Sequence, residues 1–124
     1  MASTTLYPIK SVYADSAFLA GSFSIAASGG AATKLTGRRY TVAKSATGEY
    51  TITLLDTWNE LVSAYVSVEA ATAVDLVAQI DNHDVTAATP VVVINLNAAA
   101  TPTEPAAVTV VHFQLVLSNT SYSQ

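Results

Sequence analysis

The chain has 124 residues, no cysteine and a formal net charge of −4, with five Lys or Arg residues against nine Asp or Glu residues. A chain of this length forms one domain, has no disulfides or thiolate metal sites, and carries the wrong charge for direct binding of nucleic acid. The first twenty residues lack the basic start and apolar run of a signal peptide, and no apolar run is long enough to span a bilayer. We therefore expect a soluble protein with no membrane partner.

Charged side chains are scarce. They make up 11% of the residues, whereas an ordinary globular domain has about 25%. One interpretation is the neutral, Thr-rich and Ser-rich surface of a β-protein. The interpretation that we favour is an assembly, in which neighbouring subunits cover much of the surface and buried charge would be costly.

Residues 1–20 have scattered aromatic side chains without a sustained period, and Pro8 favours an extended backbone at the residue before it. A flexible terminus is one interpretation. A free tail, however, seldom carries so many large apolar groups. We predict an extended arm that contacts another subunit through Leu6, Tyr7, Ile9, Val12 and Tyr13.

Residues 21–124 form a single domain in this interpretation, because short alternating segments are separated by turn signals throughout. Seven strands are expected, at 21–26, 38–44, 49–54, 63–70, 74–80, 91–96 and 107–118. This pattern predicts an all-β fold, an antiparallel β-sandwich or jelly-roll-like domain with about seven or eight strands.

The strands at 38–44 and 49–54 are separated by a four-residue turn that ends in Gly48, which predicts an antiparallel hairpin. Arg38 and Arg39 are the one basic spot in the chain. On a strand, adjacent side chains point to opposite faces, so the two arginines should not form a patch. We expect one of them to form an ion pair with a partner subunit.

The segment 56–61 breaks the alternation, and Thr57 and Glu60 have the spacing of a capping box. We predict one helical turn that places Trp58 and Leu61 over the open end of a core. Trp58 is the only tryptophan in the chain, and a core role for it is favoured over a ligand platform.

Residues 70–80 have a competing helical interpretation, because Ala, Glu, Leu and Gln are good helix formers. The two-residue spacing of the apolar positions favours a strand. Residues 81–84 then form a polar turn, and the loop 97–106, with two prolines, passes from one sheet to another.

The segment 107–118 is the strand around which we expect the domain to be organised. Val111, Phe113, Leu115 and Leu117 fall on one face with a period of two, which predicts a buried stripe. The other face is mixed, and it includes Val110 and His112, two further candidates for a partner interface.

Candidate chemistry is sparse. Asp75, Asp81, His83 and Asp84 are the only concentration of titratable groups, and their spacing matches no calcium loop or zinc motif. His112 has no nucleophile motif to act with, so a partly buried, hydrogen-bonded histidine is expected there. We expect neither catalysis nor a bound metal or cofactor.

Several segments resemble small virion proteins of tailed bacteriophages. They are residues 48–54, 75–80, the strand that ends at 95–97, and 111–119. Together they cover residues 21–121 in order and spacing. Many of those proteins are small β-sandwiches, and several are capsid decoration, or cement, proteins.

The resemblance implies a homotrimer on the outer surface of the capsid, where it contacts the major capsid protein and an arm reaches a neighbour. It implies no catalytic residue. The alternative is a receptor-binding or carbohydrate-binding tip of a tail fibre or head fibre, with a shallow site at Trp58, Tyr65 or the loop 97–106. A third hypothesis, a hydrolase that uses His83 or His112, has the least support.

Overall fold

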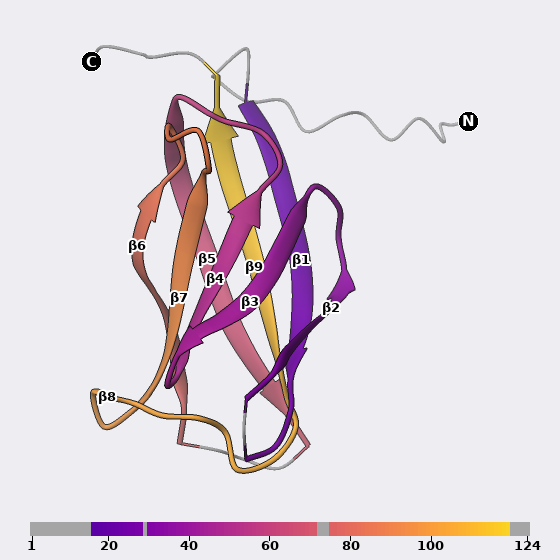
Figure 1. Cartoon of the computed structure of the whole chain (residues 1–124), viewed down its shortest axis with the longest axis vertical. Helices are drawn as coiled ribbons and strands as arrows, with labels where there is room; N and C mark the ends of the chain where they lie inside the picture. The colour runs from indigo at the N-terminus through magenta and orange to yellow at the C-terminus, as the bar shows by residue number, and fades with distance from the viewer. Residues whose placement is uncertain (1–15, 29, 72–74, 120–124) are drawn as a thin grey trace.

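The computed structural model describes residues 16–28, 30–71 and 75–119. These residues form nine strands and no helix, arranged as two antiparallel sheets (Figure 1). The strands are β1 (Ser16–Ile25), β2 (Ala32–Thr36), β3 (Tyr40–Ala46), β4 (Glu49–Leu54), β5 (Glu60–Ala70), β6 (Val77–Asp84), β7 (Val91–Ala98), β8 (Thr101–Pro102) and β9 (Thr109–Ser118). The predicted all-β, jelly-roll-like antiparallel sandwich is confirmed.

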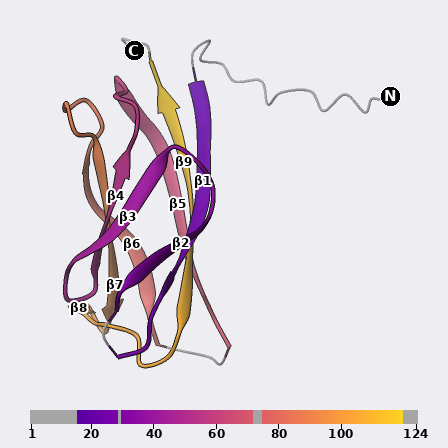
Figure 2. The same ribbon diagram turned by 45° about the vertical axis from the view of Figure 1, so that its right-hand side comes forward.

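The strand order is β2-β1-β9-β5 in the first sheet and β3-β4-β7-β6 in the second, where the short β8 pairs with β7. Figure 2 shows the two sheets as separate layers. The β7–β9 connection crosses from the second sheet to the first, as predicted, but the predicted loop 97–106 is shorter: residues 97–98 belong to β7 and residues 101–102 form β8. The start of β1 and the end of β9 lie at the same end of the sandwich (Figure 1).

The last long strand, β9, has the central position predicted for it. It pairs with β1 over ten residues, from Ser118 opposite Ser16 to Thr109 opposite Ile25, and with β5 on its other side. Val111, Leu115 and Leu117 are fully buried. The alternating pattern of this segment therefore predicted both its strand and its buried face.

The core fills the space between the two sheets with aliphatic and aromatic side chains. Phe113 of β9 packs edge-on against Tyr40 of β3, with ring centroids 4.9 Å apart and an interplanar angle of 88°. Phe23 of β1 lies 6.4 Å from Phe113 and 5.9 Å from Tyr50. The edge-to-face Phe113–Tyr40 pair adds stabilisation beyond the burial of area. This pair and the Phe23–Tyr50 contact connect the two sheets.

The predicted hairpin is present as β3 and β4, and Tyr50, Ile52 and Leu54 of β4 point inward. Its first strand begins two residues later than predicted. Arg38 and Arg39 lie in the β2–β3 loop rather than on a strand, because Arg39 has a φ of 66°. This left-handed conformation cannot continue a strand. The placement of these arginines on opposite faces of a strand was wrong.

Two boundaries near the start of the chain also differ from the prediction. Residues 16–20, assigned to the arm, belong to β1 and pair with β9. The remaining arm residues, 1–15, lie outside the described part of the chain. The short strand β2 was not predicted, because only two of its five residues, Ala32 and Leu35, are apolar.

The helical turn predicted at 56–61 does not form. The backbone N–H of Trp58 donates to the Val85 carbonyl at 2.8 Å, and that of Asn59 donates to the Ser118 carbonyl at 2.9 Å. These bonds take the donors that a helical turn would need. Trp58 and Leu61 are nevertheless partly buried against the core, as expected.

The polar turn predicted at 81–84 was wrong as well. These residues belong to β6, an edge strand that pairs with β7 from Val77 to Asp84. Edge strands tolerate polar side chains because one side of the strand faces solvent. The turn begins after Asp84, whose carboxylate accepts hydrogen bonds from the backbone N–H and the hydroxyl of Thr86, at 3.2 and 3.0 Å.

Candidate functional site

The first half of β1 has an uncovered edge. β2 pairs with β1 only from Ser22 to Ile25, so residues 17–20 have β9 on one side and no described strand on the other. A strand edge of this kind presents backbone N–H and C=O groups that another extended segment can pair with. It is therefore a candidate contact surface.

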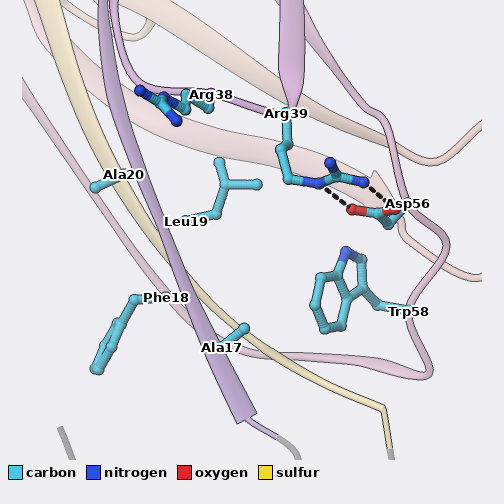
Figure 3. A pocket seen from close by; sticks show the side chains of 8 residues that line it. All are labelled: Ala17, Phe18, Leu19, Ala20, Arg38, Arg39, Asp56 and Trp58. Carbon is cyan, nitrogen blue, oxygen red and sulfur yellow. Dashed lines mark hydrogen bonds and ion pairs between the residues drawn. The ribbon is translucent and has the colours of Figure 1, made fainter. Parts of the chain in front are cut away.

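A groove of about 310 Å³ runs beside this open edge (Figure 3). β1 supplies one wall, the β2–β3 loop supplies the arginines, and the β4–β5 loop supplies an acid and the tryptophan. The lining residues are Ala17, Phe18, Leu19, Ala20, Arg38, Arg39, Asp56 and Trp58. We call this site the edge groove.

An ion pair closes one end of the edge groove. Arg39 Nε donates to Asp56 Oδ2 and Arg39 Nη2 donates to Asp56 Oδ1, both at 2.7 Å (Figure 3). The hydrogen bond from Arg39 lowers the pKa of Asp56, and the same bond raises the pKa of Arg39. This bidentate geometry fixes the relative position of the two loops.

The β2–β3 loop passes very close to β1. Gly37 has a φ of 95°, and a Cβ on it would lie 2.5 Å from the Ala20 carbonyl oxygen. A larger residue would be strained both by its backbone angle and by this contact. On the other side, the Leu55 N–H donates to the Arg39 carbonyl at 3.0 Å. The loop is thus held against both sheets.

Two further groups in the edge groove have no partner within the described part of the chain. Arg38 forms no ion pair there. Trp58 Nε1 is buried without a hydrogen-bond acceptor, and Figure 3 shows it on the side of the ring nearest the Arg39–Asp56 pair. Together with Phe18 and Leu19, these residues give the groove an apolar and cationic character.

The outer face of the first sheet carries a second, shallower depression. Its volume is about 470 Å³, and Tyr65, His112 and Gln114 are among the residues that line it. The Tyr65 residue is 62% exposed. His112 Nε2 lies 2.6 Å from Glu69 Oε1. We call this site the outer groove; Ala20 lines both grooves.

The predicted interface residues fall into three groups. Leu6, Tyr7, Ile9, Val12 and Tyr13 lie outside the described residues. Arg38 and Arg39 meet at the edge groove, where Arg39 pairs with Asp56 of the same chain. Val110 and His112 share the outward face of β9, and His112 is hydrogen-bonded as expected but exposed rather than partly buried.

Sequence reasoning missed Phe18 and Asp56. Phe18 could have been found by extending the alternation of β1 back to Ser16. Asp56 gave no sequence signal, since its partner is 17 residues away and the two meet only through packing of the loops.

Other kinds of site are absent from the described ranges. No group of three or more His, Cys, Asp or Glu residues there is placed to hold a metal ion. The same ranges contain no helix with the length and apolar character needed to cross a membrane. Comparison of the chain with protein-family models, with curated proteins and with solved structures finds no match in any of the three.

Proposed function

We propose that this chain is a structural virion protein, a trimeric capsid decoration protein that stabilises a tailed-phage head by bridging major capsid proteins. It acts on the outer surface of the capsid and is not an enzyme. The observation that carries this proposal is the uncharged open edge of β1, bordered by the exposed ring of Phe18. Such an edge favours contact with another protein over exposure to solvent.

The outer face of the first sheet supports the same proposal. Four large apolar side chains point outward from this sheet, because each alternates along its strand with inward-facing residues: Phe18, Tyr65, Val110 and Val116. The same face also carries Glu69 and His112, which lie 2.6 Å apart, and Glu60, which pairs opposite Ser118 at one end of β5. A face of this composition suits a contact with a neighbouring protein better than the mixed charge of an ordinary surface.

The mechanism that follows is one of added contact area. A subunit that binds several shell proteins at once adds interfaces that must be lost before the lattice opens, so binding stabilises the shell by mass action and by linking several sites. No chemical step is needed for this function.

Addition of the purified protein to heads of the corresponding phage that lack it tests this proposal. We expect saturable binding with a fixed number of copies per head, and we expect decorated heads to release their DNA at a higher temperature than bare ones. Heads that neither bind the protein nor gain thermal resistance would contradict the proposal.

A second candidate is a carbohydrate-binding or receptor-binding tip of a tail fibre or head fibre. The observation in its favour is the outer groove, where the exposed Tyr65 ring lies beside Gln114 and His112. Aromatic faces with adjacent hydrogen-bonding groups are common in ligand sites. A glycan array would support this candidate if it gave a ligand whose binding is lost in Tyr65→Ala but kept in Thr41→Ala, a change on β3 of the other sheet.

A further inference from the structure

We propose that the edge groove receives an extended segment from residues 1–15 of a neighbouring copy, which adds to the first sheet as an extra strand beside β1. This inference rests on the proposed assembly of several copies and names the contact that joins them. It follows from three features: the composition of the sheet edges, the direction of the β1 peptide groups, and the sequence that precedes Ser16.

The open half of β1 differs from every other described sheet edge. The other edge strands of five or more residues carry charged residues: Lys34 on β2, Lys44 on β3, Glu60 and Glu69 on β5, and Asp81 and Asp84 on β6. The remaining one, β8, has only two residues, one of which is Pro102. Pairing is also irregular within β3, β5 and β6. Charges and bulges are the usual means of keeping an edge from pairing with another strand. Residues 17–20 have neither.

The peptide groups at this edge point outward at the positions that a new strand would use. The Ser22 carbonyl accepts the Tyr40 hydroxyl at 3.0 Å, and the Ala20 carbonyl faces Gly37, so both turn away from β9. Peptide groups alternate in direction along a strand. Phe18 therefore offers its N–H and C=O to the open side. Because Gly37 closes the edge at Ala20, the added strand pairs around Phe18.

The segment 1–15 has the composition that this edge requires. It contains one lysine and one aspartate, and its large apolar side chains, Leu6, Tyr7, Ile9, Val12 and Tyr13, suit a groove lined by Phe18, Leu19 and Trp58. Fully extended, these residues span about 50 Å. They join the described part of the chain at Ser16, at the same end of β1 as the groove.

The occupant is a neighbouring copy rather than the same chain. To lie beside its own β1, the segment would have to reverse direction around residues 14–17. Two-residue hairpin turns favour Asn-Gly, Asp-Gly or Gly-Gly pairs, and residues 14–17 contain Asp15 but no Gly to follow it. Passage of each segment to the next copy is a head-to-tail contact, which closes on itself in a ring such as a trimer.

Disulfide trapping in the full-length protein tests this contact, and the chain offers a clean background because it has no cysteine. One variant carries Leu6→Cys, Ile9→Cys or Val12→Cys together with a size tag, and the other carries Ala17→Cys, next to Phe18 in the open part of the groove. We expect at least one pair to form a mixed disulfide between chains several-fold faster than the same arm variant does with Thr41→Cys, an exposed position on β3. Equal rates for both acceptors would overturn the inference.

A chain that carries both an arm cysteine and Ala17→Cys distinguishes a segment that comes from a neighbouring copy from one that returns to its own groove. Mixed with an excess of cysteine-free copies, it should form little internal disulfide, because its groove is filled by other chains. A prevailing internal disulfide under that dilution would show that the segment returns to its own groove, and would overturn the exchange between copies.

The backbone contact has its own test. Phe18→Pro removes the N–H that faces the open edge, whereas Phe18→Val removes the ring and keeps the N–H. Proline is tolerated at an edge where the N–H faces solvent, so both variants should fold. We expect self-association at least tenfold weaker for Phe18→Pro than for Phe18→Val, by sedimentation equilibrium. Equal association would overturn strand addition. Failure of the unmodified protein to bind phage heads would instead overturn the proposed function.

Discussion

The ion pair between Arg39 and Asp56 links the two loops that border the edge groove. Its two hydrogen bonds of 2.7 Å come from Nε and Nη2, along one edge of the guanidinium, and the acceptors are the two oxygens of one carboxylate. Both side chains remain substantially exposed. Exposed pairs contribute modestly to stability, so the main role of this ion pair is to position the two loops. Its contribution to stability should depend on pH.

Asp56→Asn should lower the melting temperature at pH 7, and the difference from the unmodified protein should shrink as the pH falls below about 4. The folded-state pKa of Asp56 is lowered from 3.8, chiefly by the Arg39 hydrogen bond. The carboxylate therefore contributes stability above that pH, and the contribution is lost as the pH falls through the folded-state pKa. Thermal melts from pH 2 to 7 measure it. A difference that is constant across this range, or that Asp75→Asn reproduces, would contradict the assignment.

Tyr50 is a buried residue whose hydroxyl has no hydrogen-bond partner among the described residues. Burial, with a smaller effect of the Glu104 carboxylate, raises the pKa of Tyr50 to about 12. A buried hydroxyl without a partner costs about 1–3 kcal/mol in desolvation. The hydroxyl of Tyr50 therefore lowers the stability of the folded protein.

Tyr50→Phe should be neutral or stabilising by up to about 1 kcal/mol at pH 7, because it removes the unsatisfied hydroxyl and keeps the ring. The raised pKa adds a second expectation. The neutral hydroxyl is favoured in the folded state, so the unmodified protein should lose stability as the pH rises from about 10 towards 12, and Tyr50→Phe should lack that component. Urea unfolding at pH 7 and at pH 11 tests both; Tyr65→Phe, at an exposed position, is the control.

Among the elements, the β7–β8 hairpin has an unfavourable turn. Its two central residues, Ala99 and Ala100, have φ values of 50° and 68°, and β8 contributes only two residues to the pairing. Left-handed backbone costs an L-residue with a Cβ roughly 1–2 kcal/mol. Turns of this type prefer Asn followed by Gly.

The double substitution Ala99→Asn and Ala100→Gly should therefore stabilise the protein by about 1–2 kcal/mol. The midpoint of urea unfolding should rise while its slope stays the same. Ala27→Gly is the matched control, because Ala27 is exposed and has no positive φ. It should destabilise slightly, since glycine only adds freedom to the unfolded chain. Similar shifts for both would contradict the explanation by turn geometry.

The alternation of apolar and polar residues predicted the strands whose buried face follows from their own sequence. In β9 and β4, alternation alone identified the buried face, and the turn before Glu49 identified the hairpin. Errors arose where distant partners decide the conformation. The N–H groups of Trp58 and Asn59 bond to other strands rather than to a helical turn, and Asp81–Asp84 is held extended by β7. Likewise, the edge groove exists only because β2 leaves half of β1 uncovered.

At the scale of the whole molecule, the scarcity of charge has a structural counterpart. Large apolar side chains that remain exposed include Phe18, Leu35, Leu55, Tyr65, Val77 and Val108. Single exposed apolar residues are ordinary on a protein surface. The proposed function accounts for two of those on the first sheet, because Phe18 borders the open edge and Tyr65 lies on the outward face.

Light scattering coupled to size-exclusion chromatography, over a concentration series of the full-length protein, tests the central claim most directly. The subunit has a mass of 12.9 kDa. The account predicts a species of three subunits at micromolar concentration and dissociation only on dilution. A compact particle of 12.9 kDa at every concentration would contradict it.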